Sequence, residues 1–272
     1  MFTDKTLAFI GAGVMGEAMI RGLVTQDLVP PDRIIAADPF APRLAEIEAR
    51  YGVRTTSDNR EAAERGQIVV LSIKPQSVPR VLPEIRGHLH SDDLLLSIMA
   101  GVPIRELADG AAHAAVVRAM PNTPAQIAQG ISVWTATPEV NEEHRAEARE
   151  ILAALGEEIF LDNEAYLDMA TALSGSGPGY VFLFMEALID AGVHMGFPRR
   201  VAEKLVIQTI RGSVDYAVGS GKHVAELRNQ VTSPGGTTAA ALYHMEKGGL
   251  RTVVSRGIWS AYQRSIELGK GE

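Results

Sequence analysis

The chain has 272 residues, of which 46% are hydrophobic and 22% charged, and this composition is ordinary for a folded protein with room for two domains. It contains no cysteine, which excludes disulfides, thiol catalysis and cysteine-based zinc sites. The formal net charge of −7 comes without a basic patch, so we expect no nucleic-acid partner.

The first residues lack the charged start and apolar core of a signal peptide. The apolar run over residues 180–196 is short for a membrane span, and Glu186, Asp190 and His194 interrupt it. We therefore expect a cytoplasmic protein without a membrane partner.

The first predicted element is an apolar strand over residues 7–10, which leads into a glycine-rich turn and a helix. The turn fits the pattern G-x-G-x-x-G, in which the first glycine allows a tight turn, the second lets a pyrophosphate approach the backbone, and the third lets the helix pack near the strand. The start of that helix offers free N–H groups to an anion. The pattern predicts a dinucleotide site that includes Gly11, Ala12, Gly13, Val14, Met15 and Gly16.

Strands alternate with helices over the following hundred or so residues, a spacing typical of βαβ units and a parallel sheet. The strands are expected at 32–38, 53–56, 67–73, 93–98 and 115–120, and the helices at 41–51, 59–65, 78–89 and after Pro103. Two further strands at 130–134 and 158–161, around a helix at 141–155, are expected to complete the sheet. We predict a Rossmann-type α/β domain over residues 1–162.

The cofactor is expected at the carboxyl ends of these strands, where open α/β sheets bind their ligands. Asp38 ends the second strand, 22 residues after Gly16, and an acid there favours the ribose 2′-hydroxyl of NAD, whereas the nearby Arg43 could accept the 2′-phosphate of NADP. The choice between NADP and NAD therefore stays open. Lys74 and Asn122 are the best placed polar groups. Taken alone, each is equally well interpreted as a surface lysine or a turn residue, but their place at the predicted cofactor edge favours a functional role. The same edge includes Ser72, Ile73, Pro75, Ala100, Gly101 and Thr123.

Strand patterns stop at residue 163. A helix is expected at 164–173, a break at the Ser-Gly-Ser-Gly-Pro-Gly stretch of 174–179, and long helices at 180–195 and 198–218 that are apolar around most of their circumference. Such helices bury more than one face, so we predict an all-α dimerisation domain over residues 163–272 and a homo-oligomer, a dimer or a larger assembly.

A second glycine-rich loop, Val-Thr-Ser-Pro-Gly-Gly-Thr-Thr over 231–238, precedes a helix expected at 239–247. Its three hydroxyls and two glycines exceed what helix capping requires, and such a loop suits a carboxylate or a phosphate. The 174–179 stretch could line a small anionic pocket by the same physics, or let two backbones touch. Because we find no metal-binding motif and no catalytic nucleophile, a bound nicotinamide must supply the chemistry.

The loop and its flanks, Leu-Arg-Asn-Gln-Val-Thr-Ser-Pro-Gly-Gly-Thr-Thr-Ala-Ala-Ala-Leu over 227–242, resemble the signature of the pyrroline-5-carboxylate reductase family. Residues 10–16, 73–75, 118–124 and 173–178 support the resemblance, which spans essentially the whole chain. It implies a Rossmann domain and a helical domain that forms intertwined dimers, often assembled into decamers. The implied reaction is hydride transfer from NAD(P)H to the C=N bond of 1-pyrroline-5-carboxylate, which gives L-proline in the last step of proline biosynthesis.

The resemblance also implies residue roles. Thr238 would hydrogen-bond the imine nitrogen as the catalytic residue, and Asn59 would lie near the adenosine ribose. The substrate site would comprise Ser233, Gly235, Gly236, Thr237, Thr238 and Ser176. The chain departs from the family at the end of the second strand, where many members have Asn-Arg or serine-rich turns and this chain has Asp38-Pro39.

Two other interpretations compete with this one. β-Hydroxyacid dehydrogenases need a catalytic lysine on the helix after a glycine-rich loop, and the helix that follows residue 178 starts without one, so we reject that class. A dinucleotide-binding sensor that only dimerises would not need the 233–238 loop, and enzyme turnover with pyrroline-5-carboxylate would discriminate the two.

Overall fold

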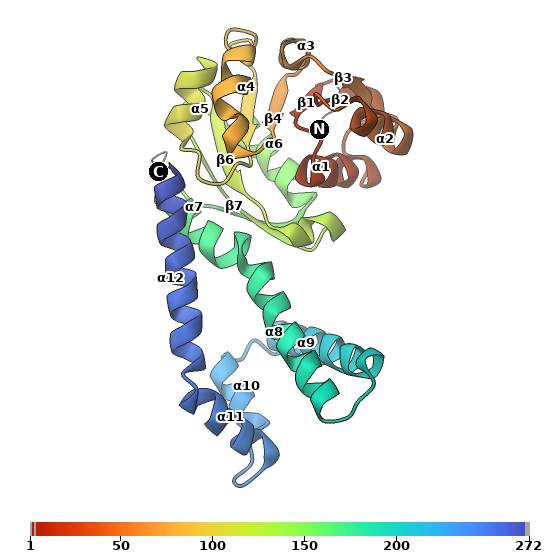
Figure 1. Ribbon diagram of the computed structural model, residues 1–272. Coiled ribbons are helices and arrows are strands. Elements are labelled where there is room, and N and C mark those ends of the chain that lie inside the picture. The colour runs from red at the N-terminus through yellow and green to blue at the C-terminus, as the bar shows by residue number, and fades with distance from the viewer. Residues whose placement is uncertain (1, 3, 270–272) are drawn as a thin grey trace. The chain divides into compact units, whose positions relative to one another are not determined.

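The computed structural model describes residue 2 and residues 4–269. Its contacts divide the chain into two compact units: residues up to 178 together with those from 261 onward, and residues 179–260. The first unit holds a sheet with helices on both faces, and the second is made of helices (Figure 1).

The sheet of the first unit has eight strands in the order β3-β2-β1-β4-β5-β6-β7-β8. All neighbouring pairs are parallel except β6 and β7, which are antiparallel. Every strand expected from the sequence is present, so the predicted Rossmann-type α/β fold is confirmed. The strands are β1 (Leu7–Ile10), β2 (Ile34–Ala37), β3 (Arg54–Thr56), β4 (Ile68–Leu71), β5 (Leu94–Ser97), β6 (Val116–Met120), β7 (Gly130–Ala136) and β8 (Gly156–Phe160).

Helices cover both faces of the sheet, and this is why β1, β2, β4 and β5 are buried along their whole length. One apolar cluster joins a face of the sheet to α1 (Val14–Thr25), α2 (Ala41–Tyr51) and α6 (Glu142–Ala153). The other cluster joins the opposite face to α3 (Asn59–Arg65), α4 (Val78–Ile85) and α5 (Ile104–Ala111). The short turns η1 (Pro31–Arg33), η2 (Pro75–Ser77) and η3 (Thr123–Ile127) lie between these elements.

The predicted break at residues 174–179 is wrong, because the chain stays helical there. After α7 (Ala165–Ala170), a π-helical turn, η4 (Thr171–Gly175), runs into α8 (Gly177–His194) with only Ser176 between them. The Ser176 N–H donates to the Thr171 carbonyl at 2.8 Å, and the Ser174 hydroxyl donates to the Ala170 carbonyl at 3.0 Å. Pro178 lies in the first turn of α8 with Gly177 and Gly179, where proline is tolerated, and Gly175 ends the wider π-helical turn.

The second unit consists of most of α8, α9 (Arg199–Ser220), α10 (Val224–Gln230), α11 (Thr237–Lys247) and the first part of α12 (Leu250–Gly269). The predicted all-α character is confirmed, and α10 is an additional helix that was not predicted from the sequence. Large apolar side chains of this unit are exposed, among them Phe182 at 63%, Leu183 at 66% and Val218 at 79%. By length and composition alone, one described helical stretch, Ala165–His194, could also cross a membrane.

Candidate active site

The glycine-rich turn between β1 and α1 has the geometry that its sequence pattern predicts. Gly11 has a φ of +101°, and a Cβ there would lie 2.7 Å from the Ser72 carbonyl oxygen. A Cβ on Gly16 would overlap the Gly11 carbonyl oxygen, so only glycine lets α1 start this close to β1. A Cβ on Gly13 would meet nothing within 4 Å, which leaves the backbone open to a ligand.

The N-terminus of α1 faces no capping side chain. Gly13 is the N-cap residue, and no side chain in the described part of the chain accepts a hydrogen bond from the first turn. The N–H groups of Val14, Met15 and Gly16 therefore have no partner within the helix. This arrangement suits the pyrophosphate of a dinucleotide, because the unpaired N–H groups and the positive end of the helix dipole both favour an anion.

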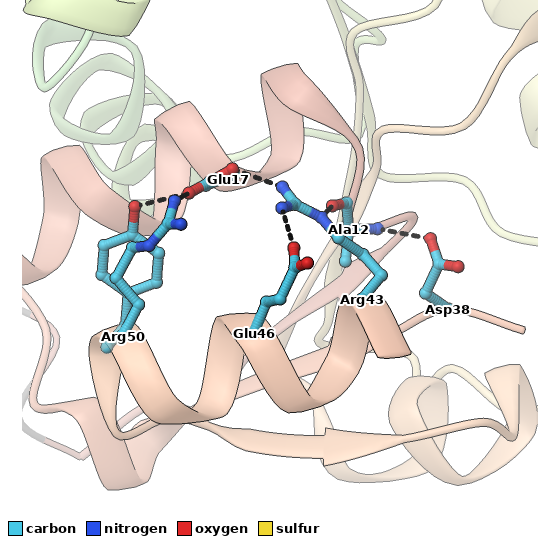
Figure 2. A network of polar contacts seen from close by, with 7 residues as sticks. Ala12, Glu17, Asp38, Arg43, Glu46 and Arg50 are labelled. Carbon is cyan, nitrogen blue, oxygen red and sulfur yellow. Dashed lines mark hydrogen bonds and ion pairs between the residues drawn. The ribbon is translucent and has the colours of Figure 1, made fainter. Parts of the chain in front are cut away.

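The peptide groups of Ala12 are held from two sides, as Figure 2 shows. The Ala12 N–H donates to Asp38 Oδ2 at 3.0 Å, and Arg43 Nε donates to the Ala12 carbonyl at 2.7 Å. The second oxygen of Asp38 accepts from the Phe40 N–H at 3.0 Å. We call Asp38 and Arg43, in these contacts, the Ala12 clamp.

Glu17 anchors Arg43 in turn. Its carboxylate accepts hydrogen bonds from Arg43, Arg50 and the Tyr51 hydroxyl, and Arg43 also contacts Glu46 at 3.1 Å (Figure 2). Burial disfavours the charged carboxylate, but the hydrogen bonds from Arg43 and Tyr51 outweigh burial and lower the pKa of Glu17 below its ordinary value of 4.5. Each of the three guanidinium nitrogens of Arg43 thus donates one hydrogen bond within the protein, two of them to carboxylates, so these contacts favour a role in the clamp over the binding of a 2′-phosphate.

A cavity of about 220 Å³ opens beside the glycine-rich turn at the carboxyl ends of β1, β2 and β4. It brings together many of the residues that the sequence placed at the cofactor site: Gly11, Gly13, Asp38, Asn59, Ser72, Ile73 and Lys74. Ser77, Arg80 and Val81 also line it, and the sequence analysis missed them. Their spacing of three and four residues, directly after the Lys74-Pro75 turn, is the helical periodicity that could have found them.

Two polar side chains of this cavity are fixed by neighbours. The Ser72 hydroxyl donates to the Gly11 carbonyl at 2.6 Å, which ties β4 to the turn. The Asn59 side-chain amide donates to Glu84 Oε2 on α4 at 2.7 Å, which leaves its oxygen available to a ligand.

Other predicted rim residues lie outside this cavity. Pro75 begins η2 and Thr123 begins η3. Asn122 Oδ1 accepts from the Ile131 N–H at 3.0 Å, as a turn residue would. Gly101 has a φ of +72°, and a Cβ there would lie 3.0 Å from the Cβ of Leu268, so it lets the end of α12 approach the turn that begins at Ala100.

The Ser-Pro-Gly-Gly-Thr-Thr loop belongs to the second unit and forms a tight turn. The Gly236 N–H donates to the Ser233 carbonyl at 3.0 Å, and Gly235 has a φ of +71°. With Pro234 ahead of that glycine, this is the signature of a type II turn. The bond corrects one expectation, because the Gly236 N–H is already used and is not free for a substrate.

The remaining polar groups of this loop are available. In the described part of the chain, the hydroxyls of Ser233, Thr237 and Thr238 and the N–H groups of Gly235 and Thr237 have no hydrogen-bond partner. By contrast, the Thr232 hydroxyl donates to the Arg228 carbonyl at 2.6 Å. The turn leads directly into α11, whose N-cap Gly236 has no side chain, so the helix start adds its dipole to these donors.

Comparison with known proteins decides the family. The chain is 40% identical to the pyrroline-5-carboxylate reductase of Pseudomonas aeruginosa over 97% of both chains, and 39% identical to that of Synechocystis over 97% of this chain and 98% of the relative. The chain belongs to the pyrroline-5-carboxylate reductase family. A pyrroline carboxylate reductase of Plasmodium falciparum, solved with NADP bound, superposes with a TM-score of 0.89 at 32% identity and covers 98% of each chain.

Family models agree with the two-part organisation of this reductase-family chain. A model described as pyrroline-5-carboxylate reductase dimerisation matches residues 164–268, and one described as NADP oxidoreductase, coenzyme F420-dependent, matches residues 6–101. The chain is an NAD(P)H-dependent oxidoreductase, it forms a homo-oligomer, and it acts on a small molecule. Among the residues that the structure describes, no group of three or more His, Asp or Glu side chains is placed to hold a metal ion.

Proposed function

We propose that the chain reduces the C=N bond of 1-pyrroline-5-carboxylate with a hydride from NADPH or NADH and so forms L-proline in the last step of proline biosynthesis. Its identity of 39–40% to two pyrroline-5-carboxylate reductases over 97% of its length carries the proposal. The 231–238 loop supports it independently, because its hydroxyls and N–H groups suit a small substrate with one carboxylate.

The bound nicotinamide supplies the hydride, and the protein supplies binding and orientation. The free N–H groups at the start of α1 would hold the pyrophosphate, and Asn59 would contact the adenosine ribose. The residues that we propose for cofactor binding are Gly11, Ala12, Gly13, Val14, Met15, Gly16, Asp38, Asn59, Ser72, Ile73, Lys74, Pro75, Ala100, Gly101, Asn122 and Thr123.

We assign the substrate carboxylate to the Ser233 hydroxyl and to the N–H groups of Gly235 and Thr237. Gly236 contributes by having no side chain at the start of α11, and Ser176 adds a hydroxyl. The Thr238 hydroxyl would accept a hydrogen bond from the N–H of the protonated imine and hold its carbon toward the hydride. The positive charge of the iminium already makes that carbon electrophilic, so we propose orientation rather than strong acid catalysis as the role of Thr238.

The test is kcat/KM for pyrroline-5-carboxylate in Thr238→Ala. A hydrogen bond to a charged group is worth about 1.5–3 kcal/mol, so the variant should lose roughly ten- to a hundredfold, with unchanged cofactor affinity. Thr238→Ser should recover most of the activity, and Thr232→Val is the matched control, because that hydroxyl already donates to the Arg228 carbonyl of α10. Full kcat/KM in Thr238→Ala would refute the role, and no turnover with either cofactor would favour a dinucleotide sensor.

We further propose a dinucleotide-binding domain over residues 1–162 and a dimerisation and substrate-binding domain over 163–272. The dimerisation model over 164–268 and the exposed apolar side chains of α8 and α9 support this division. The dimerisation model favours a protein partner for these side chains, so we propose a cytoplasmic dimer or decamer that binds neither membrane nor nucleic acid. Analytical ultracentrifugation distinguishes these assemblies from a monomer.

A further inference from the structure

NADP differs from NAD by one phosphate on the 2′-oxygen of the adenosine ribose, and in this fold the end of β2 lies beside that oxygen. The two residues that the sequence places there are both committed to the Ala12 clamp. Each guanidinium nitrogen of Arg43 already donates one hydrogen bond, to Ala12, Glu17 or Glu46, and each oxygen of Asp38 accepts a backbone N–H (Figure 2). These contacts hold Arg43 toward two carboxylates, and Asp38 is an acceptor with no donor for a phosphate, so a cation outside the clamp is the better candidate to bind a 2′-phosphate.

Arg80 on α4 is placed differently. It lines the same cavity as Asp38 and Asn59, it is exposed, and among the described residues it has no ion pair or side-chain hydrogen bond. Arg80 is four residues before Glu84, so both lie on one face of α4, and Glu84 holds the Asn59 amide at 2.7 Å. The face of α4 that carries Arg80 is thus the face next to Asn59.

The charges of the cavity favour an additional anion. Its charged lining residues are Asp38, Lys74 and Arg80, and the Asp38 carboxylate is partly satisfied by two backbone N–H groups. Lys74 lies three residues after the end of β4, directly before η2, and its ammonium is a point charge. Arg80 is the other cation of the lining, and its planar guanidinium matches a phosphate with two parallel hydrogen bonds.

We propose that Arg80 binds the 2′-phosphate of NADP and makes the chain prefer NADP over NAD. The proposal rests on the dinucleotide site of the proposed function and adds the residue that selects between the two cofactors. Because Arg80 is exposed, its contribution weakens as salt screens the charges.

Equilibrium binding of two fragments separates this role from catalysis. Adenosine 2′,5′-bisphosphate carries the 2′-phosphate and 5′-AMP lacks it, and the full chain is titrated with each by calorimetry at low and high salt. We expect the wild type to bind the bisphosphate more tightly, and Arg80→Ala to weaken it by roughly tenfold or more while 5′-AMP changes less than about twofold. Arg80→Lys should keep part of the preference. Arg33→Ala, in η1 before β2, is the charge-matched control and should change neither fragment.

Each other outcome overturns the proposal in a recognisable way. An equal loss of affinity for both fragments in Arg80→Ala would mean that Arg80 contacts the adenosine that they share. Unchanged affinity for both fragments would mean that Arg80 does not contact the bound cofactor. A wild type that binds 5′-AMP as well as the bisphosphate would leave no preference for Arg80 to explain. A wild type that binds neither fragment nor NADH would instead overturn the dinucleotide site and the proposed function with it.

Discussion

Replacing Asp38 with asparagine tests whether this side chain reads the cofactor or shapes the turn that binds it. Asp38 accepts two backbone N–H groups at 3.0 Å, one from Ala12 and one from Phe40, and asparagine has only one oxygen to offer. One N–H therefore faces an amide NH2 group and loses its partner. A buried group left in that state costs about 1–3 kcal/mol, and the partial exposure of this site favours the lower part, about 1–2 kcal/mol.

We expect the lost partner to be that of the Ala12 N–H, so that the turn relaxes in the free protein. Binding of the pyrophosphate common to both cofactors must then restore the turn, which transfers the cost to the affinity. We expect Asp38→Asn to raise the Kd of NADH and of NADPH alike, by roughly five- to thirtyfold, and to leave their ratio within about twofold of the wild type. The assay is direct titration of the two reduced cofactors by their fluorescence. Asp32→Asn, in η1 before β2, is the matched control, because its side chain has no partner among the described residues. A selective loss of NADH with a gain in NADPH would refute the reasoning, because Asp38 would then read the ribose 2′-hydroxyl.

Two further predictions concern stability. Arg118 is 3% exposed and contacts Glu164 at 2.6 Å and Asp168 at 3.6 Å. Arg118→Ala should therefore lower the free energy of unfolding, measured by urea denaturation, by about 2–4 kcal/mol. The control is Arg105→Ala, which breaks an exposed ion pair and should change the free energy of unfolding by less than about 1 kcal/mol. The pKa of Glu17 is lower in the folded chain than its ordinary 4.5, because hydrogen bonds outweigh the effect of burial, so its stabilisation is fully present above pH 4.5 and is lost as the pH falls through the folded pKa. The difference in urea midpoint between wild type and Glu17→Gln should therefore be constant from pH 7 to pH 5 and shrink toward pH 3, and a constant difference down to pH 3 would contradict this assignment.

The strands were predictable because a parallel sheet buried on both faces leaves continuous apolar runs, such as Leu7–Ile10 and Ile68–Leu71. Such runs predict a strand but not whether it pairs parallel or antiparallel with its neighbour. The antiparallel pairing of β7 with β6 follows instead from the length of their connection. Residues 121–129 form a segment that is shorter than the dozen or so residues that a parallel crossover needs. The length of the connection thus predicts the direction of β7, whereas the apolar pattern alone does not.

Glycine and proline misled the prediction at residues 174–179. Their usual effect is to end a helix, but this depends on where in the helix they fall. Pro178 lies in the first turn of α8, and Gly175 ends a π-helical turn that packs beside Met120, whose Cε would lie 2.6 Å from a Cβ on Gly175. Because that packing involves residues more than fifty positions apart, no local pattern could have revealed it.

At the predicted cofactor site, too, local sequence patterns do not show which distant side chains contact each other. The glycine-rich turn and Asp38 line one cavity in the structure, and the sequence could predict that they lie close together because the ends of neighbouring parallel strands meet at one edge of the sheet. It could not say that Arg43 turns toward Glu17, because that depends on how α2 packs against α1. An arginine near a predicted phosphate site is therefore a weaker indication than an arginine without a partner in the folded cavity.

The predictions for Asp38 and Arg80 constrain each other, because they assign the shape of the glycine-rich turn to Asp38 and the selectivity for NADP to Arg80. If the Ala12 clamp only shapes the turn, Asp38→Asn changes both affinities and leaves their ratio, whereas Arg80→Ala changes the ratio and leaves the common affinity. The double variant should then show the sum of the two free-energy changes, because the clamp acts on the pyrophosphate and Arg80 on the 2′-phosphate. A coupling larger than about 0.5 kcal/mol between the two substitutions would mean that Asp38 and Arg80 act on the same ribose, and the assignment of selectivity to Arg80 alone would fall.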